Sequence, residues 1–261
     1  MADRGPQIAY EARGLTKRFG HIEACTDIGL AMQPGEITAI VGDNGAGKST
    51  LVKMLTGAMR PDDGEILLDG QPVQFRDPLD ARLRGVEVVY QELALAPNLD
   101  VTANVFLGRE VVKEGSRILR RLDKKAMSIS ARKEVASLNI NLPSVTGVVV
   151  GAMSGGQRQC VAIARAAYWA KSVIIMDEPT AALGLRESQA VLDLIKAIRD
   201  RGLAVGLISH SLPHVAELAD HVVVLRHGRK VADIRHEKLS VARLMQLIVE
   251  GNPAAQIGNV N

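Results

Sequence analysis

The sequence predicts an α/β fold in which helices cover both faces of a mainly parallel sheet. Three observations predict it: short apolar runs alternate with helical periodicity, a glycine-rich loop joins one run to a helix, and a charged helical segment interrupts the alternation. Strands that alternate with helices form parallel sheets, because the helical crossover returns the chain to the same edge. The 261 residues, 47% of them hydrophobic, suffice for one such domain with an insertion.

The N-terminal third carries the pattern of an antiparallel β subdomain. Residues 10–30 have the pattern of short strands and turns, and residues 60–74 contain the hairpin punctuation Asp-Gly, then three apolar residues, then Asp69-Gly70. Between these two stretches, residues 37–41 form a short apolar run after a Pro-Gly turn, which is typical of a buried strand.

Residues 94–151 differ in character, and we expect them to form an inserted helical subdomain with a helix over residues 124–138. Their cluster of Arg120, Arg121, Lys124 and Lys125 is interpreted as a solvated helix face. The alternation continues on either side of the insertion. Strands are predicted at residues 86–89, 173–176 and 204–208, and helices at 48–56, 157–170 and 187–200, the last ended by Gly202. A single domain over residues 8–251 and a flexible tail over 252–261 complete the expected organisation.

Composition argues against several classes of partner. Only 3% of residues are aromatic and the formal net charge is +3, so neither a stacking platform nor a basic track for nucleic acid is expected. The two cysteines, Cys25 and Cys160, lie far apart and are expected to be buried free thiols, which fits a reducing compartment. The first ten residues lack the layout of a signal peptide, and no uncharged apolar run reaches 18 residues. Any association with a membrane must therefore come through a partner.

The strongest local motif is a glycine-rich loop that fits G-x-x-x-x-G-K-[ST] between a predicted strand and a predicted helix. Its backbone N–H groups and the helix N-terminus are suited to hold phosphate oxygens, so the loop by itself predicts a P-loop core that binds phosphate; the family resemblance given below implies that the ligand is ATP. We expect Lys48 to reach the β- and γ-phosphates and the Ser49 hydroxyl to bind Mg²⁺. The predicted nucleotide-binding residues here are Gly42, Asp43, Asn44, Gly45, Ala46, Gly47, Lys48, Ser49 and Thr50.

A second motif places two carboxylates, Asp177 and Glu178, at the end of the apolar run 173–176. Ligands of open α/β sheets bind at the carboxyl ends of the strands. Strands often end in acidic residues without any catalytic role, but the glycine-rich loop upstream favours the functional interpretation. Asp177 is then expected to hold Mg²⁺, and Glu178 to orient or deprotonate the attacking water.

A third motif, formed by Met153, Ser154, Gly155, Gly156 and Gln157, resembles the LSGGQ signature of ABC ATPases, with Met153 in place of leucine. A turn of small residues that feeds a helix N-terminus is a second phosphate site. A second phosphate site is redundant beside a complete P-loop in one chain. It has a use if two copies pair head-to-tail, so that Ser154, Gly155, Gly156 and Gln157 complete the site of the partner copy.

Other residues match the same family, and the resemblance covers residues 8–251. It implies that Gln91 touches Mg²⁺ and the attacking water, that His210 holds the γ-phosphate, and that Phe19 stacks on adenine. With Lys48 and Glu178, Gln91 and His210 form the expected catalytic set. A lone histidine after a strand is more often structural, and a core role is the alternative for Phe19. Gly184 departs from the pattern, because an aspartate that contacts the partner copy usually stands there, and communication between the two sites is therefore in doubt.

Residues 57–66, 91–99 and 104–110 resemble bacterial monosaccharide importers of the ribose, xylose and fructose type. The resemblance implies a peripheral ATPase subunit on the cytoplasmic face of the inner membrane, bound to integral permease subunits and served by a periplasmic sugar-binding protein. Many members carry two ATPase domains in one chain, whereas no internal repeat is found here. The alternatives are the ATPase of an exporter and a soluble ABC ATPase. The long coiled coil typical of DNA-repair members is missing, since about 60 residues without heptads separate Gln91 from Ser154.

Overall fold

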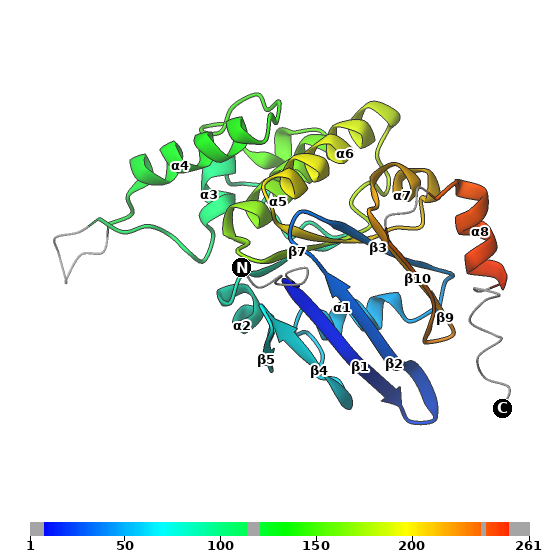
Figure 1. Ribbon diagram of the computed structural model, residues 1–261. Helices are drawn as coiled ribbons and strands as arrows, with labels where there is room; N and C mark the ends of the chain where they lie inside the picture. The colour runs from blue at the N-terminus through cyan, green and yellow to red at the C-terminus, as the bar shows by residue number, and fades with distance from the viewer. Residues whose placement is uncertain (1–7, 114–120, 236–238, 251–261) are drawn as a thin grey trace, which may run out of the picture.

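The computed structural model describes residues 8–113, 121–235 and 239–250, and Figure 1 shows two sheets with helices packed around them. The predicted α/β fold with a mainly parallel sheet is confirmed. The larger sheet has six strands in the order β10-β9-β3-β8-β7-β6, and only β10 runs antiparallel to its neighbour. Its strands are β3 (Ile37–Gly42), β6 (Val86–Val89), β7 (Val173–Asp177), β8 (Ala204–Ile208), β9 (His221–Arg226) and β10 (Arg229–Arg235). The loops after β3, β7 and β8 therefore lie at one edge of this sheet.

The smaller sheet is antiparallel and has the order β2-β1-β4-β5. Its strands are β1 (Tyr10–Phe19), β2 (Ile22–Met32), β4 (Asp63–Leu68) and β5 (Gln71–Val73). The expectation of short strands over residues 10–30 is wrong in length, since β1 and β2 have 10 and 11 residues. The register between the two strands shifts at three points along β1. Such β-bulges make the pairing locally irregular without ending the strand.

Helices fill the space between the sheets and cover the outer face of the larger one (Figure 1). They are α1 (Lys48–Leu55), α2 (Pro78–Leu83), α3 (Val101–Phe106), α4 (Lys124–Ser137), α5 (Gly155–Trp169), α6 (Leu185–Asp200), α7 (Leu212–Leu218) and α8 (Val241–Glu250), with a short 3-10 helix at Val150–Ala152. The buried face of α1 shares a core with both sheets, through residues such as Leu51, Tyr10 and Ile40. A second core joins α5 and α6 to the other face of the larger sheet. α6 ends at Asp200, and Gly202 follows with φ 87°, as predicted.

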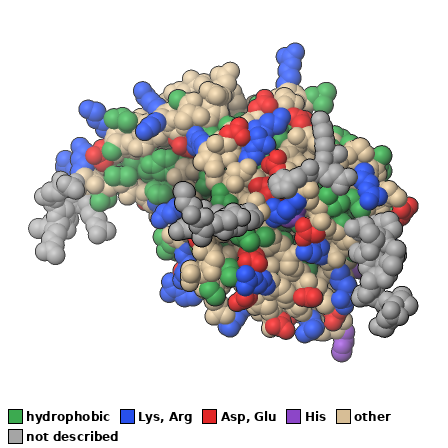
Figure 2. Space-filling model, in the orientation of Figure 1, with side chains coloured by type: hydrophobic (Ala, Val, Ile, Leu, Met, Phe, Trp, Pro, Cys, Tyr) green, Lys and Arg blue, Asp and Glu red, His purple; other side chains and the backbone are tan. Residues whose placement is uncertain are grey.

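The helical segment between β6 and α5 has a core of its own. Phe106 of α3 is buried and packs edge-to-face on Tyr168 and Trp169 of α5, with ring centroids 5.1 and 5.7 Å apart. Met153 and Val161, which follow residue 151, also belong to this core, so α5 closes it. Arg121, Lys124 and Lys125 are exposed as expected, whereas Arg120 and the tail 252–261 lie outside the described residues. Figure 2 shows hydrophobic side chains gathered over this part of the molecule, where Leu107, Val111, Val112 and Leu122 are exposed.

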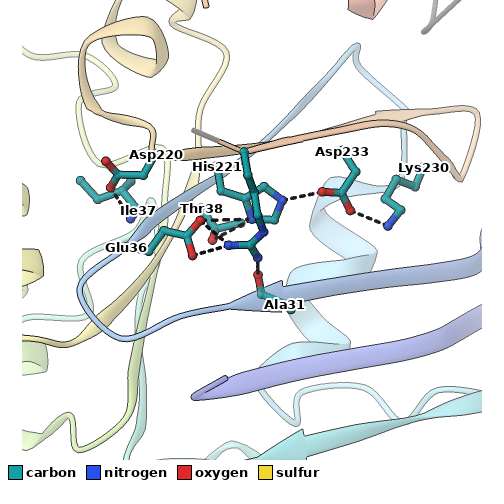
Figure 3. A network of polar contacts seen from close by, with 9 residues as sticks. Ala31, Glu36, Ile37, Thr38, Asp220, His221, Lys230 and Asp233 are labelled. Carbon is teal, nitrogen blue, oxygen red and sulfur yellow. Dashed lines mark hydrogen bonds and ion pairs between the residues drawn. The ribbon is translucent and has the colours of Figure 1, made fainter. Parts of the chain in front are cut away.

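A buried polar network joins the two sheets at their common edge (Figure 3). The His221 side chain is 1% exposed, with its Nε2 2.7 Å from Asp233 Oδ1 and its Nδ1 3.3 Å from Thr38 Oγ1. Arg235 of β10 donates to both carboxylate oxygens of Glu36 and to the carbonyl of Ala31 in β2. The network thereby binds β2 of the antiparallel sheet to β10 of the parallel one, and its charges are paired as buried charges must be.

Candidate functional site

The glycine-rich loop lies between the end of β3 and the start of α1, as the sequence predicts. Lys48 is the first residue of α1, and its Nζ donates to the carbonyls of Gly42 and Asp43 at 2.6 and 3.0 Å. The lysine side chain therefore folds back across the loop, and its ammonium lies beside the loop backbone at Gly42 and Asp43. A cation and a helix N-terminus at one place make this loop suited to a polyphosphate.

A cavity of about 610 Å³ opens over the loop and brings together most of the predicted site. Gln91 enters from the segment after β6, Asp177 and Glu178 from the end of β7, and His210 from the segment after β8. These three segments meet because β6, β7 and β8 are parallel neighbours and present the same end. The cavity is lined by Ile22, Glu23, Ala24, Asn44, Gly45, Ala46, Gly47, Lys48, Ser49, Thr50, Gln91, Asp177, Glu178, Ile208, His210 and His227.

Glu178 and His210, which both line this cavity, contact each other through their side chains. His210 Nδ1 lies 2.8 Å from Glu178 Oε1, and the His210 backbone N–H donates to Glu178 Oε2 at 3.4 Å. The histidine side chain is 74% exposed and the glutamate 14%. Glu178 holds φ at 51°, a left-handed conformation that costs a residue with a side chain about 1–3 kcal/mol. The strained backbone of Glu178 therefore lowers stability, and in this conformation its carboxylate points into the cavity.

Asp177 precedes Glu178 in the chain, and its surroundings disfavour the ionised form of its carboxyl group. Burial, and then the charge of Glu178, raises the pKa of the Asp177 carboxyl, while the Lys48 ammonium acts in the opposite direction. A further cation near Asp177 would favour its ionised form. The described residues contain no group of three or more His, Cys, Asp or Glu side chains that could hold a metal ion on its own. A metal here would need ligands of other kinds, such as hydroxyl, amide and phosphate oxygens.

Several predicted nucleotide-binding residues do not line this cavity. Phe19, at the end of β1, is 47% exposed, and Gly42 and Asp43 line a neighbouring cavity with Ser209 and Met245. The signature-like turn lines a different cavity, beside α4 and α6, through Ser154, Gly156 and Gln157. That turn is well ordered by its own hydrogen bonds: the Gln157 N–H donates to Ser154 Oγ, and the Ser154 N–H donates to Gln157 Oε1. It does not complete the cavity of its own chain.

Sequence analysis missed four of the residues that line the cavity. Ile22, Glu23 and Ala24 come from the start of β2, and His227 comes from the turn between β9 and β10. The Thr26 N–H donates to the Gly228 carbonyl at 2.7 Å, which holds these two segments together. No local signal marks them, because only the packing of one sheet on the other brings them to the loop.

Comparison with known proteins identifies the family. The sequence profile described as ABC transporter matches residues 25–181. The chain is 50% identical over 225 residues to the fructose import ATP-binding protein FrcA of Rhizobium meliloti, which covers 85% of this chain and 86% of that protein. The chain belongs to the ABC transporter family. ATP hydrolysis is the activity of this family, so the chain is an ABC ATPase.

Other members of the ABC family match over nearly the full chain. Identity is 39% with the xylose/arabinose import ATP-binding protein XylG of Sulfolobus acidocaldarius, over 96% of each chain. Identity is 41% with the ribose import ATP-binding protein RbsA 1 of Burkholderia cenocepacia, over 94% of this chain but 47% of that protein, so this chain spans about half its length. A nucleotide-free ATP-binding cassette superposes with a TM-score of 0.80 at 24% identity, covering 94% of this chain and 98% of that one. No helix within the described ranges is long and apolar enough to cross a membrane.

Proposed function

We propose that this ABC ATPase powers the uptake of a monosaccharide through integral permease subunits, at the cytoplasmic face of the inner membrane. The observation that carries the proposal is the 50% identity to a protein named for fructose import, joined by relatives named for xylose/arabinose and ribose import. Exposed apolar residues over the helical segment, among them Leu107 and Leu122, support docking of a membrane partner there. A periplasmic sugar-binding protein would deliver the sugar to the permease.

Within the cavity, each proposed catalytic residue has a distinct task. The Lys48 ammonium binds the β- and γ-phosphates, and the loop N–H groups hold the remaining phosphate oxygens. Glu178 accepts a proton from the attacking water or orients it, and His210, 2.8 Å from Glu178, holds the γ-phosphate beside that carboxylate. Phe19, which lies outside the lining of this cavity, stacks on adenine, and the lining residues of β2 and the β9–β10 turn contact the base and ribose.

The residues near the loop also fit Mg²⁺. Ser49, Gln91 and Asp177 offer hydroxyl, amide and carboxylate oxygens around one cavity, which is the hard-ligand set that Mg²⁺ prefers alongside phosphate oxygens. Burial and the charge of Glu178 raise the pKa of the Asp177 carboxyl, and the positive charge of a bound cation would act in the opposite direction, as the Lys48 ammonium does. A Mg²⁺ ion held by these residues would supply positive charge that offsets the negative charge developing on the phosphate groups.

The signature-like turn supports a site shared between two copies of the chain. Ser154, Gly156 and Gln157 line a cavity apart from the P-loop, so we propose that they bind the γ-phosphate held by a second copy, arranged head-to-tail. Dimeric cassettes among the structural relatives, one described as a post-hydrolysis state bound to ADP and Pi, have the same fold at 22–23% identity. Closure of the pair on ATP would move the permease subunits, because ATP binds the closed state more tightly than the open one.

A complementation experiment tests the shared site. Chains with Lys48→Ala and chains with Ser154→Arg should each be inactive, since every site in either homodimer lacks one half. Mixing them should restore activity, because the mixed dimer contains one site with an intact P-loop and an intact signature. A mixture that stays as inactive as its components would show that the turn acts within its own chain.

Uptake by whole cells tests the transport function. Cells that lack the gene are expected to lose accumulation of one labelled monosaccharide from a panel of fructose, ribose and xylose. The wild-type gene should restore it, and a Glu178→Gln gene should not. Loss of efflux in place of uptake would exclude an importer, whereas restored accumulation that is insensitive to Glu178→Gln would contradict the role given to Glu178. Co-purification with integral membrane proteins from detergent extracts separates transport from a soluble ATPase.

A further inference from the structure

The Glu187 carboxylate connects two loops that the proposed mechanism treats separately. Glu187 lies in the first turn of α6, and its Oε1 accepts from the backbone N–H of Gly156 at 3.4 Å. Its Oε2 accepts from the backbone N–H of Gly184, also at 3.4 Å. One side chain thus bridges the signature-like turn at the start of α5 and the residue that precedes α6.

Packing at the signature turn reinforces these hydrogen bonds. A Cβ placed on Gly156 would lie 2.7 Å from Glu187 Cβ and 2.8 Å from its Cγ, so the stem of Glu187 rests directly on this glycine. A hydrogen bond with the Ser154 hydroxyl, followed by those with the Gly184 and Gly156 N–H groups, lowers the pKa of the Glu187 carboxyl. The carboxylate is therefore held in its charged form by two residues of the turn and one of the loop.

The loop that Glu187 reaches begins at the catalytic carboxylate. The Ala181 N–H donates to the Glu178 carbonyl at 3.1 Å, and the Leu183 N–H donates to the Thr180 carbonyl at 3.4 Å. Two successive hydrogen-bonded turns therefore connect Glu178 to Gly184. Glu187 therefore links the signature turn, through hydrogen bonds and packing, to the loop that starts at Glu178.

Gly184 gives this connection its importance. The ABC pattern usually places an aspartate there to contact the partner copy, and Gly184 has no side chain that could do so. The first turn of α6 also receives no side-chain cap from Gly184, and the Glu187 carboxylate is the group that bonds the N–H at that position. The adjacent Leu185 is 92% exposed, which fits a surface that faces a second copy.

We propose that Glu187 is a positioning residue that ties the signature turn to the loop after Glu178, so that ATP held by one copy can be capped by the other. The proposal rests on the shared ATP site proposed above. Glu187 itself need not touch ATP. It sets the place of Ser154 and Gly156, the groups that would, and links them to the water-handling carboxylate of the same chain.

The test uses chains with Glu178→Gln, in which ATP is expected to be retained and to hold two copies together. Dimer formation with ATP is measured by analytical ultracentrifugation over a range of protein concentrations, and ATP affinity of the single chain by calorimetry at low concentration. Adding Glu187→Ala should raise the concentration for half-dimerisation about tenfold, as expected for lost hydrogen bonds to a charged group. ATP affinity of the single chain should stay the same, because Glu187 lies outside the P-loop cavity.

Two further variants make the outcome decisive. Glu187→Gln keeps one acceptor oxygen at the same reach and should recover part of the loss. The matched control is Glu217→Ala, which removes an exposed carboxylate of α7 that accepts a hydrogen bond from Lys196 of α6. This variant should leave dimerisation unchanged. If Glu187→Ala dimerises like its parent, the positioning role is wrong. If the Glu178→Gln parent shows no dimer at all with ATP, the shared site itself fails, which is a separate result. If Glu187→Ala does not fold, the comparison of Glu187→Gln with its parent decides.

Discussion

Replacing Glu178 with glutamine isolates the activation of water from the binding of ATP. The Glu178 side chain is only 14% exposed and points at His210, with Oε1 2.8 Å from Nδ1. Glutamine has nearly the same shape and can still bond through its amide, so the cavity should keep its form. It cannot accept a proton at pH 7. General-base catalysis contributes about 10²–10⁴-fold, so hydrolysis should fall by that factor, equivalent to about 2.7–5.5 kcal/mol of activation free energy.

Phosphate release measured at saturating ATP reports this loss directly. ATP affinity measured by calorimetry on the same variant should stay within about threefold of wild type, because the groups that bind phosphate are untouched. Glu217→Gln provides the control, since it makes the same chemical change on an exposed part of α7. Unchanged steady-state hydrolysis in Glu178→Gln would refute the assignment of Glu178 as the residue that handles water.

Three other predictions follow from the same structure. Lys48→Ala should weaken ATP binding about 10- to 150-fold in calorimetry, because hydrogen bonds to a charged group are lost; wild-type affinity would contradict the role given to Lys48. Phe106→Ala should lower the free energy of unfolding by about 3–5 kcal/mol in urea titrations, because Phe106 is buried against two aromatic rings; a loss below about 1 kcal/mol would show that the pocket closes. The hydrogen bond from His221 holds the pKa of the Asp233 carboxyl below its ordinary value, so its contribution is present above about pH 4 and lost as pH falls through the folded pKa. Asp233→Asn should therefore be less stable than wild type at pH 7, and the gap should narrow in acid; a gap independent of pH would exclude this linkage.

The parts of the fold that the sequence predicts are those whose signals are local. The first four residues of the strand Val173–Asp177 are a fully buried apolar run, and the glycine-rich loop has its motif within eight residues. The register of β1 against β2 is different, because its shifts depend on how two long strands pair across a tight turn. Helix α8 also carries a local signal, since Leu244, Leu247 and Ile248 recur at helical spacing.

The same distinction applies to the candidate site. The P-loop and Asp177-Glu178 could be predicted because each motif ends an apolar strand. Their assembly around one cavity follows from parallel strands sharing an edge, which sequence alternation already implies. His227 could not be predicted, because it reaches the cavity only when the β9–β10 turn packs against the start of β2. Glu187 is similar, since its partners Gly156 and Gly184 are brought together by the packing of α5 on α6.

The conformation of the glycine-rich loop depends on packing against both sheets, and this packing constrains Gly42 and Gly47 in addition to the proposed binding of phosphate. A Cβ on Gly47 would lie 2.5 Å from the Ala24 carbonyl oxygen of β2, and one on Gly42 would overlap the Leu225 carbonyl of β9. The Gly228 N–H also donates to the Ala46 carbonyl at 3.1 Å, so the β9–β10 turn bonds directly to the loop. A side chain at either position would push a strand away as well as alter phosphate binding. The polar network around His221 joins β2 to β9 and β10 further along the same strands. The packing of β2 against these two strands therefore determines both this network and the shape of the glycine-rich loop.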